Sequence, residues 1–127
     1  MGRITREMDV GGQRFLAMFD TGSKNTYVLS AVADAAGGRV SMPPRGVALG
    51  GRPHTLREMC LLRATVEGYG VEGDAYVIDA LGRDDQGRAI EILVGALMMQ
   101  KWCIRLIPDE ERLDWTYYPF AFNEFAV

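Results

Sequence analysis

Histidine, cysteine and long apolar runs are all scarce in this sequence of 127 residues. His54 is the single histidine, which excludes a multi-histidine metal site, and neither cysteine stands at metal-ligand spacing from it. Two cysteines, Cys60 and Cys103, are too few for a disulfide framework, and we expect both to be small apolar residues within strands. A Cys–His pair between His54 and one of these thiols stays open as a geometric alternative.

Membrane and nucleic-acid signals are missing as well. No apolar run is long enough to span a membrane, and no signal peptide follows Met1, so a reducing cytoplasm is the expected location. The formal net charge is only −3 and the basic residues are scattered, which does not indicate nucleic acid or an acidic partner. Gly50-Gly51 precedes Arg52-Pro53 instead of a helix start, so it is not a phosphate-binding loop.

Length and composition predict one domain, covering residues 1–127. The hydrophobic share of 48% and the charged share of 24% are ordinary for a globular protein. A tail from about residue 112 to residue 127 is rich in aromatic residues: Trp115, Tyr117, Tyr118, Phe120, Phe122 and Phe125. Leu113, Trp115 and Tyr117 alternate with polar residues, which predicts a strand with one buried face. This tail has two alternative contacts, its own domain or a partner subunit.

The most informative stretch begins with an apolar run at residues 15–19, which is typical of a buried strand. This strand would deliver Asp20 from the interior into a loop. Gly22 permits a tight turn and a close approach by another chain or a ligand. Thr21 and Ser23 place hydroxyl groups where they can donate to the carboxylate or anchor the loop. Taken alone, the triplet also fits an ordinary Asp-x-Gly turn.

The sequence Asp20-Thr21-Gly22-Ser23 after an apolar strand resembles the active-site signature of aspartic proteases. With one such motif, the chain is similar to the retroviral-type, homodimeric (retropepsin-like) branch of that family. Residues 92–97 resemble a second family element, two apolar residues before a glycine that opens a short helix. Residues 47–54 resemble the flap hairpin that closes over substrate, and its predicted substrate-binding residues are Leu49, Gly50, Gly51, Arg52 and Pro53.

The resemblance covers roughly residues 4 to 117, in the family's order. It implies an all-β, barrel-like acid protease fold, a single lobe with a flap hairpin and one or two short helices. It also implies an aspartic endopeptidase in which a homodimer brings two Asp20 carboxyl groups together, because one chain supplies only one. Two carboxyl groups about 3 Å apart share a proton and activate water without a metal or another cofactor. The substrate would be an extended peptide or protein segment bound under the flap.

By the same resemblance, Thr21 would brace the two loops across the axis, and Gly22 would leave room for the substrate backbone. Ser23 would donate a hydrogen bond to the Asp20 carboxylate. The flap departs from the retroviral pattern, because Arg52 and Pro53 make its tip polar and stiff, and His54 is expected in the loop near that tip. Two alternatives remain: a protease-like module that binds peptide or dimerises without cleaving, and an unrelated β-barrel binding domain.

The remaining pattern predicts a succession of short elements. Strands are expected at residues 5–10, 13–19, 26–29, 54–67, 71–79, 90–94 and 103–107, and helices at 31–36 and 95–102. Ser30 should cap the first helix, and the prolines within 42–44 should interrupt regular structure. Leu97, Met98 and Trp102 are predicted core residues. Asp84 and Asp85, within a polar loop at 81–89, should be solvated.

Overall fold

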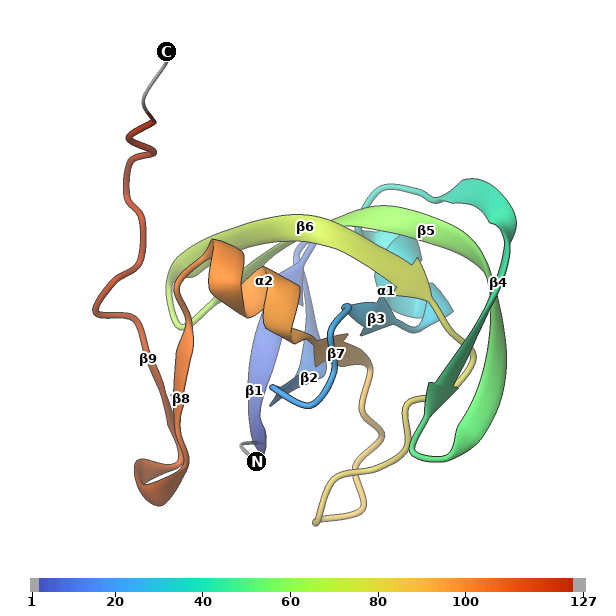
Figure 1. Ribbon diagram of the computed structural model, residues 1–127, viewed down its shortest axis with the longest axis horizontal. Helices are drawn as coiled ribbons and strands as arrows, with labels where there is room; N and C mark the ends of the chain where they lie inside the picture. Colours follow the sequence, from blue (N-terminus) through green and yellow to red (C-terminus); the bar gives the residue numbers. More distant parts are fainter. Residues whose placement is uncertain (1–2, 125–127) are drawn as a thin grey trace.

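The computed structural model describes residues 3–124, and the fold is mostly β (Figure 1). The strands are β1 (Arg3–Val10), β2 (Gln13–Asp20), β3 (Tyr27–Val28), β4 (Val40–Leu49), β5 (Arg52–Val66), β6 (Tyr69–Val77), β7 (Ile92–Val94), β8 (Arg105–Ile107) and β9 (Arg112–Asp114). The helices are α1 (Ser30–Ala35), α2 (Ala96–Lys101) and a single 3₁₀ turn, η1 (Pro108–Glu110). The expected flap hairpin and two short α-helices are thus confirmed. Phe125 of the aromatic tail lies outside the described residues.

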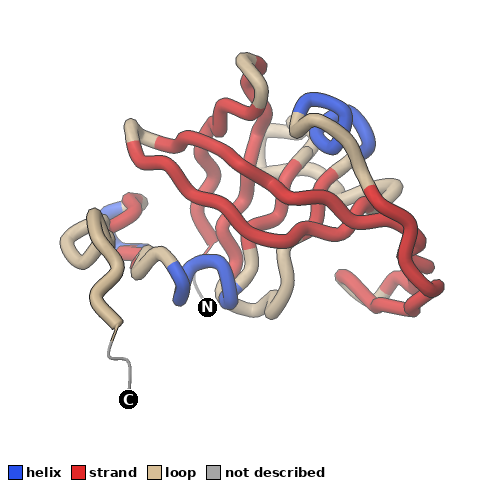
Figure 2. Tube along the Cα trace, turned by 90° about the horizontal axis from the view of Figure 1, so that it is seen from above, coloured by secondary structure: helices blue, strands red, loops and turns tan. Residues whose placement is uncertain are grey.

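Seven strands form one sheet in the order β1-β2-β7-β3-β6-β5-β4, and β8 pairs with β9 separately. β1 also pairs with β5 through Asp9 and Thr65, so the sheet curls back on itself. Figure 2 shows this curvature from above, with the two α-helices on different sides of the strands. β7 is inserted between β2, to which it runs parallel, and β3, to which it runs antiparallel. The loop from β2 to β3 therefore has to cross the end of β7.

Glycine pairs set the two most important hairpin turns. Gly11 and Gly12 have φ values of 56° and 83°, and Gly50 and Gly51 have values of 56° and 78°. Two consecutive residues with positive φ are what the type I′ turn of a two-residue β-hairpin requires. The strands flanking the first turn pair without a break from Val10–Gln13 to Arg3–Asp20. The second turn forms the tip of the β4–β5 hairpin, as predicted for the flap.

Two groups of apolar side chains form the interior. The larger one fills the curl of the sheet and includes Met8, Phe19, Leu62, Ile92 and Val94, all fully buried. The smaller one, which we call the flap-side cluster, is built around the buried residues Tyr27, Leu56, Ile78 and Leu93. Met18 from β2 and Val47 and Leu49 from the flap pack against this cluster. Alternate residues of β2 thus serve different groups: Phe19 the larger one and Met18 the flap-side cluster.

Several local predictions are wrong for identifiable reasons. Pro43 and Pro44 do not end regular structure, because β4 is an edge strand and a register shift between Ser41 and Arg45 accommodates them. Ser30 is the first residue of α1 and not its cap, and its hydroxyl accepts a hydrogen bond from Arg39 instead. Cys60 is a buried strand residue as expected, whereas Cys103 follows α2 with a left-handed φ of 55°.

The loop at residues 81–89 and helix α2 also differ in detail. Asp84 is not simply solvated: its carboxylate accepts hydrogen bonds from the backbone of Gln86 and from the backbone and guanidinium of Arg88. The adjacent Asp85 is exposed, as predicted. On α2, Met98 is buried, but Leu97 is 48% exposed and is not a core residue. No helix within residues 3–124 has the length and apolar character needed to cross a membrane.

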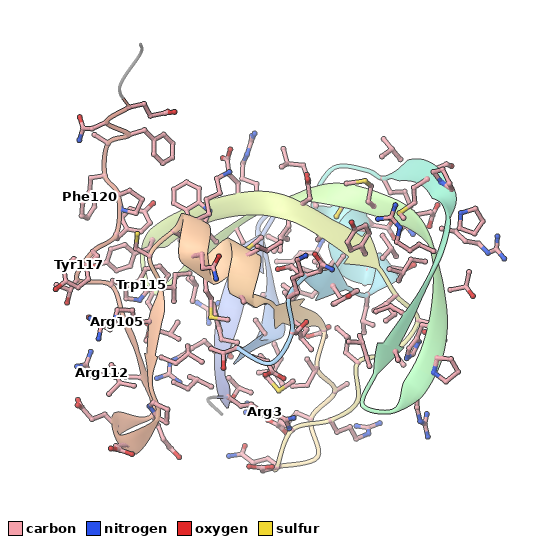
Figure 3. All side chains as sticks on the ribbon, in the orientation of Figure 1. Arg3, Arg105, Arg112, Trp115, Tyr117 and Phe120 are labelled. Atoms are coloured by element: carbon pink, nitrogen blue, oxygen red, sulfur yellow. The ribbon has the colours of Figure 1, made fainter. Side chains whose placement is uncertain are left out.

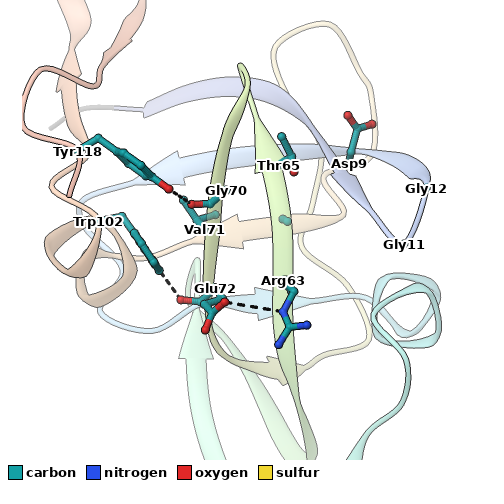
Figure 4. A pocket seen from close by; sticks show the side chains of 11 residues that line it. Asp9, Gly11, Gly12, Arg63, Thr65, Gly70, Val71, Glu72, Trp102 and Tyr118 are labelled. Atoms are coloured by element: carbon teal, nitrogen blue, oxygen red, sulfur yellow. Dashed lines mark hydrogen bonds and ion pairs between the residues drawn. The ribbon is translucent and has the colours of Figure 1, made fainter. Parts of the chain in front are cut away.

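The tail packs on its own domain through part of its length. The strand predicted through Tyr117 ends at Asp114, whose side chain accepts hydrogen bonds from Thr116 and turns the chain. Trp115 stacks on Tyr69 with ring centroids 4.3 Å apart. Figure 4 shows Tyr118 and the buried Trp102 donating hydrogen bonds to backbone carbonyl groups of β6. Tyr117, Phe120 and Phe122 stay exposed, and Figure 3 shows the first two on the outer side of the tail.

Candidate active site

Asp20 is the last residue of β2 and is only 7% exposed. Its Oδ1 accepts a hydrogen bond of 2.8 Å from the Gly22 N–H group, and its carbonyl oxygen accepts one of 3.2 Å from the Ser23 N–H group. These two contacts close a tight turn directly after the strand. The carboxylate is thereby fixed by the backbone of its own loop at the end of a buried strand.

Arg3 is a neighbour of Asp20 that the sequence patterns did not single out. Its Nε lies 3.5 Å from Asp20 Oδ2, and Arg3 stands directly opposite Asp20 in the β1–β2 pairing. The arginine side chain is 62% exposed and that of Asp20 is 10% exposed. A signal for this contact was present, because an unbroken hairpin around Gly11-Gly12 necessarily pairs residue 3 with residue 20.

The loop that follows Asp20, residues 21–26, is held in place by the start of α2. The N–H groups of three consecutive residues point at it: Gly95 donates to Thr26 Oγ1 at 3.1 Å, Ala96 to the Ser23 carbonyl at 2.7 Å, and Leu97 to the Lys24 carbonyl at 3.0 Å. The first N–H groups of a helix have no partner within the helix, so they are free to make such bonds. The element predicted at residues 92–97 is therefore the support for the loop that carries Asp20.

Gly95 itself is required by close packing. A Cβ atom at this position would lie 2.1 Å from the Asn25 carbonyl oxygen and 2.8 Å from that of Lys24. Both atoms belong to the backbone, so neither can move without shifting the loop. Its φ of −94° is an ordinary value, so the requirement is for space and not for backbone freedom. Any other residue would push the loop away from α2.

Among the remaining loop residues, Ser23 takes a role that differs from the one implied by the resemblance. Ser23 Oγ donates to the Asn25 carbonyl at 2.9 Å instead of to the Asp20 carboxylate, so it stabilises the loop. Gly22 contributes its N–H group to Asp20. Thr21 is exposed in the single subunit and lines an apolar hollow of about 570 Å³ with α2 and Ile104. Thr26, which the sequence reasoning missed, is 3% exposed and accepts the Gly95 hydrogen bond.

The predicted flap residues, Leu49, Gly50, Gly51, Arg52 and Pro53, form the tip of the β4–β5 hairpin. His54 is not in the loop, because it pairs with Val47 within the hairpin. Its Nδ1 lies 2.7 Å from Asp79 Oδ1, and this hydrogen bond holds the pKa of Asp79 below its usual value. His54 thus ties the flap to the segment that follows β6.

Cys60, His54 and the possible metal ligands are the alternatives to Asp20 as a reactive centre. Burial raises the pKa of Cys60, which disfavours the reactive thiolate, and the Nδ1 atom of His54 is engaged by Asp79. Within residues 3–124, no group of three or more histidine, cysteine, aspartate or glutamate side chains is arranged to hold a metal ion. The structure therefore directs attention to Asp20.

The strand order, the inserted β7, the flap hairpin and the loop held against α2 together define a retropepsin-like fold. No family model and no curated protein sequence matches this chain. Among solved structures, the retroviral protease-like domain of Ddi1 from Leishmania major matches with a TM-score of 0.67 and 16% sequence identity, covering 92% of this chain and 90% of that chain. The EIAV protease complexed with the inhibitor HBY-793 matches with a TM-score of 0.61 and 14% identity, covering 84% and 93%. At these identities the likeness establishes the shared fold.

Proposed function

We propose that two copies of this chain form an aspartic endopeptidase whose catalytic pair is Asp20 of each subunit. The observation that supports this most strongly is the placement of Asp20. Its carboxylate is largely buried, it is hydrogen-bonded by the loop that follows it, and the start of α2 holds that loop in place. Because the loop is already fixed, little conformational entropy has to be lost to position the carboxylate when a reaction begins. The chain contains one Asp-Thr-Gly motif, so the second carboxylate comes from the second copy.

In the proposed dimer, the two carboxyl groups share one proton. One acts as the base for the attacking water and the other as the acid that polarises the peptide carbonyl. Because the proton belongs to the pair, activity follows a bell-shaped pH profile with an optimum from acidic to near neutral pH. The exposed Thr21 is available to contact the partner loop, while Gly22 and Ser23 keep each carboxylate in place. The substrate is an extended peptide covered by the flap.

A protease-like module that binds peptide without cleaving is the second candidate. The observation that favours it is the Arg3–Asp20 ion pair, which engages one carboxylate oxygen in the single subunit. That contact has to rearrange before two Asp20 side chains can share a proton. An inhibitor that mimics the tetrahedral intermediate separates the candidates, because thermal stabilisation by the inhibitor without any peptide cleavage supports the module.

The decisive variant is Asp20→Asn, which keeps the shape of the side chain and removes the titrating group from both subunits. We expect loss of cleavage of a random peptide library, read by mass spectrometry, with the fold preserved by circular dichroism. Asp85→Asn is the matched control, because Asp85 is exposed and lies outside the site, and it should cleave like the parent protein. Substantial hydrolysis by purified Asp20→Asn protein would refute the mechanism.

Dependence on a dimer is tested separately by dilution. Specific activity should fall as the protein is diluted through the dimer dissociation constant measured by analytical ultracentrifugation. Constant specific activity down to a demonstrated monomer would contradict the shared pair.

A further inference from the structure

The flap carries most of the arginines that form no ion pair within the described residues. Of the twelve arginines in the chain, eight form ion pairs within residues 3–124. Arg83, outside the flap, donates to a backbone carbonyl. The other three, Arg45, Arg52 and Arg57, are all exposed and all lie on the β4–β5 hairpin. Among the arginines of residues 3–124, those without an ion pair or a side-chain hydrogen bond are therefore concentrated on one hairpin.

The sequence around the flap is also more basic than the rest of the chain. Residues 35–57 contain four arginines and no acidic residue, whereas the rest of the chain contains ten basic and seventeen acidic residues. The basic residues were expected to be scattered, but relative to the acidic residues they are concentrated in this segment. A small basic surface on an otherwise acidic protein attracts a local negative charge on its partner and does not favour a long polyanion.

Strand register separates the flap into two faces. Cross-strand partners share a face, and alternate residues of a strand share a face. The pairs Arg45–Leu56, Val47–His54 and Leu49–Arg52 therefore place six side chains on one face. Leu56 is 2% exposed within the flap-side cluster, and Val47 and Leu49 pack against that cluster, so this is the inner face. Arg57 stands on the opposite, outer face.

The inner face is on the same side of the molecule as the catalytic carboxylate. Met18 belongs to the flap-side cluster, and Met18 and Asp20 are two residues apart on β2, so they share a face of that strand. A peptide reaching Asp20 under the flap would meet apolar groups from Val47 and Leu49 and the guanidinium of Arg52. His54 already bonds Asp79, which leaves Arg52 as the free cation of the tip.

We propose that this flap selects substrates with an acidic side chain beside the apolar residues that flank the scissile bond, and that Arg52 pairs with that carboxylate. The inference rests on the proposed endopeptidase function and adds its substrate class. A guanidinium presents a planar set of donors that matches a carboxylate, and a lid that excludes water strengthens the pair. Arg45, at the base of the same face, extends the preference to a second acidic position.

The test uses one peptide found by the library digest and its Glu→Gln counterpart, with each kcat/KM measured separately. The parent protein should prefer the glutamate peptide about 10- to 100-fold, as a charged hydrogen bond lost from a covered site implies. Arg52→Gln should bring the ratio close to one. Arg57→Gln removes the same charge from the outer face of the same hairpin and should leave the ratio unchanged. The preference should also weaken as salt is raised.

A second measurement keeps the inference independent of catalysis. Asp20→Asn protein should still bind the glutamate peptide more tightly than the glutamine peptide in fluorescence anisotropy, and adding Arg52→Gln should abolish the difference. Equal ratios for the parent and Arg52→Gln proteins, in cleavage and in binding, would overturn the substrate assignment whether or not the protein is a protease. Arg52-dependent binding of a single-stranded oligonucleotide such as dT20, without any preference between the peptides, would overturn it equally.

Discussion

Replacing Gly95 with alanine should separate the loop at residues 21–26 from the helix that supports it. The added Cβ would lie 2.1 Å from the Asn25 carbonyl oxygen, where ordinary contact begins at 3.4 Å, so the loop has to move by more than an ångström. Overpacking of this kind costs about 1–3 kcal/mol. The movement also weakens the hydrogen bonds from Ala96 and Leu97, each contributing about 1 kcal/mol. We expect a total loss of about 3–5 kcal/mol, a large part of the 5–15 kcal/mol typical of a domain.

The assay is urea unfolding followed by circular dichroism, with all proteins at one concentration because dimerisation affects apparent stability. Peptide cleavage should fall together with the unfolding midpoint, since the displaced loop carries Asp20. Gly46→Ala is the matched control: its added Cβ meets no atom within 4 Å, so its stability should stay within about 0.5 kcal/mol of the parent. The reasoning is refuted if Gly95→Ala unfolds at the same urea concentration as Gly46→Ala and cleaves peptide normally.

Two further predictions concern contacts around the site. Thr26→Val removes the buried oxygen that accepts the Gly95 N–H hydrogen bond, and it should lower the free energy of unfolding by about 1–3 kcal/mol. Thr26→Ser keeps a hydroxyl group and should retain most of this stability. Equal urea midpoints for the two variants would argue against the hydrogen bond as the source of the stability. The hydrogen bond to His54 is the main reason why the pKa of Asp79 is lowered in the folded protein. The Asp79 carboxylate therefore stabilises the fold at pH values above its unfolded-state pKa, and this contribution is lost as pH falls through its folded-state pKa. Melting curves between about pH 6 and pH 2 should therefore show a smaller acid-dependent loss for Asp79→Asn than for the parent, and parallel curves would contradict the contact.

The parts of the fold that sequence patterns predicted well are those specified by neighbouring residues. The apolar run at residues 15–19 and the polar residues after it were sufficient to place Asp20 at the end of a buried strand. Gly11-Gly12 forms the turn between the strands predicted at 5–10 and 13–19, and Gly50-Gly51 forms the flap tip that the family resemblance predicted; both pairs have positive φ, which is costly for other residues. These features require no knowledge of distant segments.

The parts that were missed depend on contacts between distant segments. Whether Ser23 Oγ bonds the carboxylate or the Asn25 carbonyl is decided by how the loop closes. In the sequence, Thr26 is indistinguishable from an ordinary strand residue. Its role depends on a hydrogen bond from the Gly95 N–H group, which is 69 residues away in the sequence. Arg3 is the exception, since the hairpin register could have placed it opposite Asp20. The prediction for the tail was wrong for another reason. The alternation of apolar and polar residues through Tyr117 suggested a strand, but the side chain of Asp114 accepts hydrogen bonds from Thr116 and turns the chain.

The insertion of β7 between β2 and β3 has a consequence for the order of events during synthesis. The strand that ends at Asp20 is synthesised well before its neighbour in the sheet, Ile92–Val94, and before the N–H groups of residues 95–97. Pairing across such a sequence separation is slow, because a long loop has to close first. Asp20 therefore reaches its final position only after residues 92–97 have emerged. A nascent chain that ends before residue 92 carries the motif but not the braced loop, so the proposed endopeptidase activity would begin only after residues 92–97 have emerged.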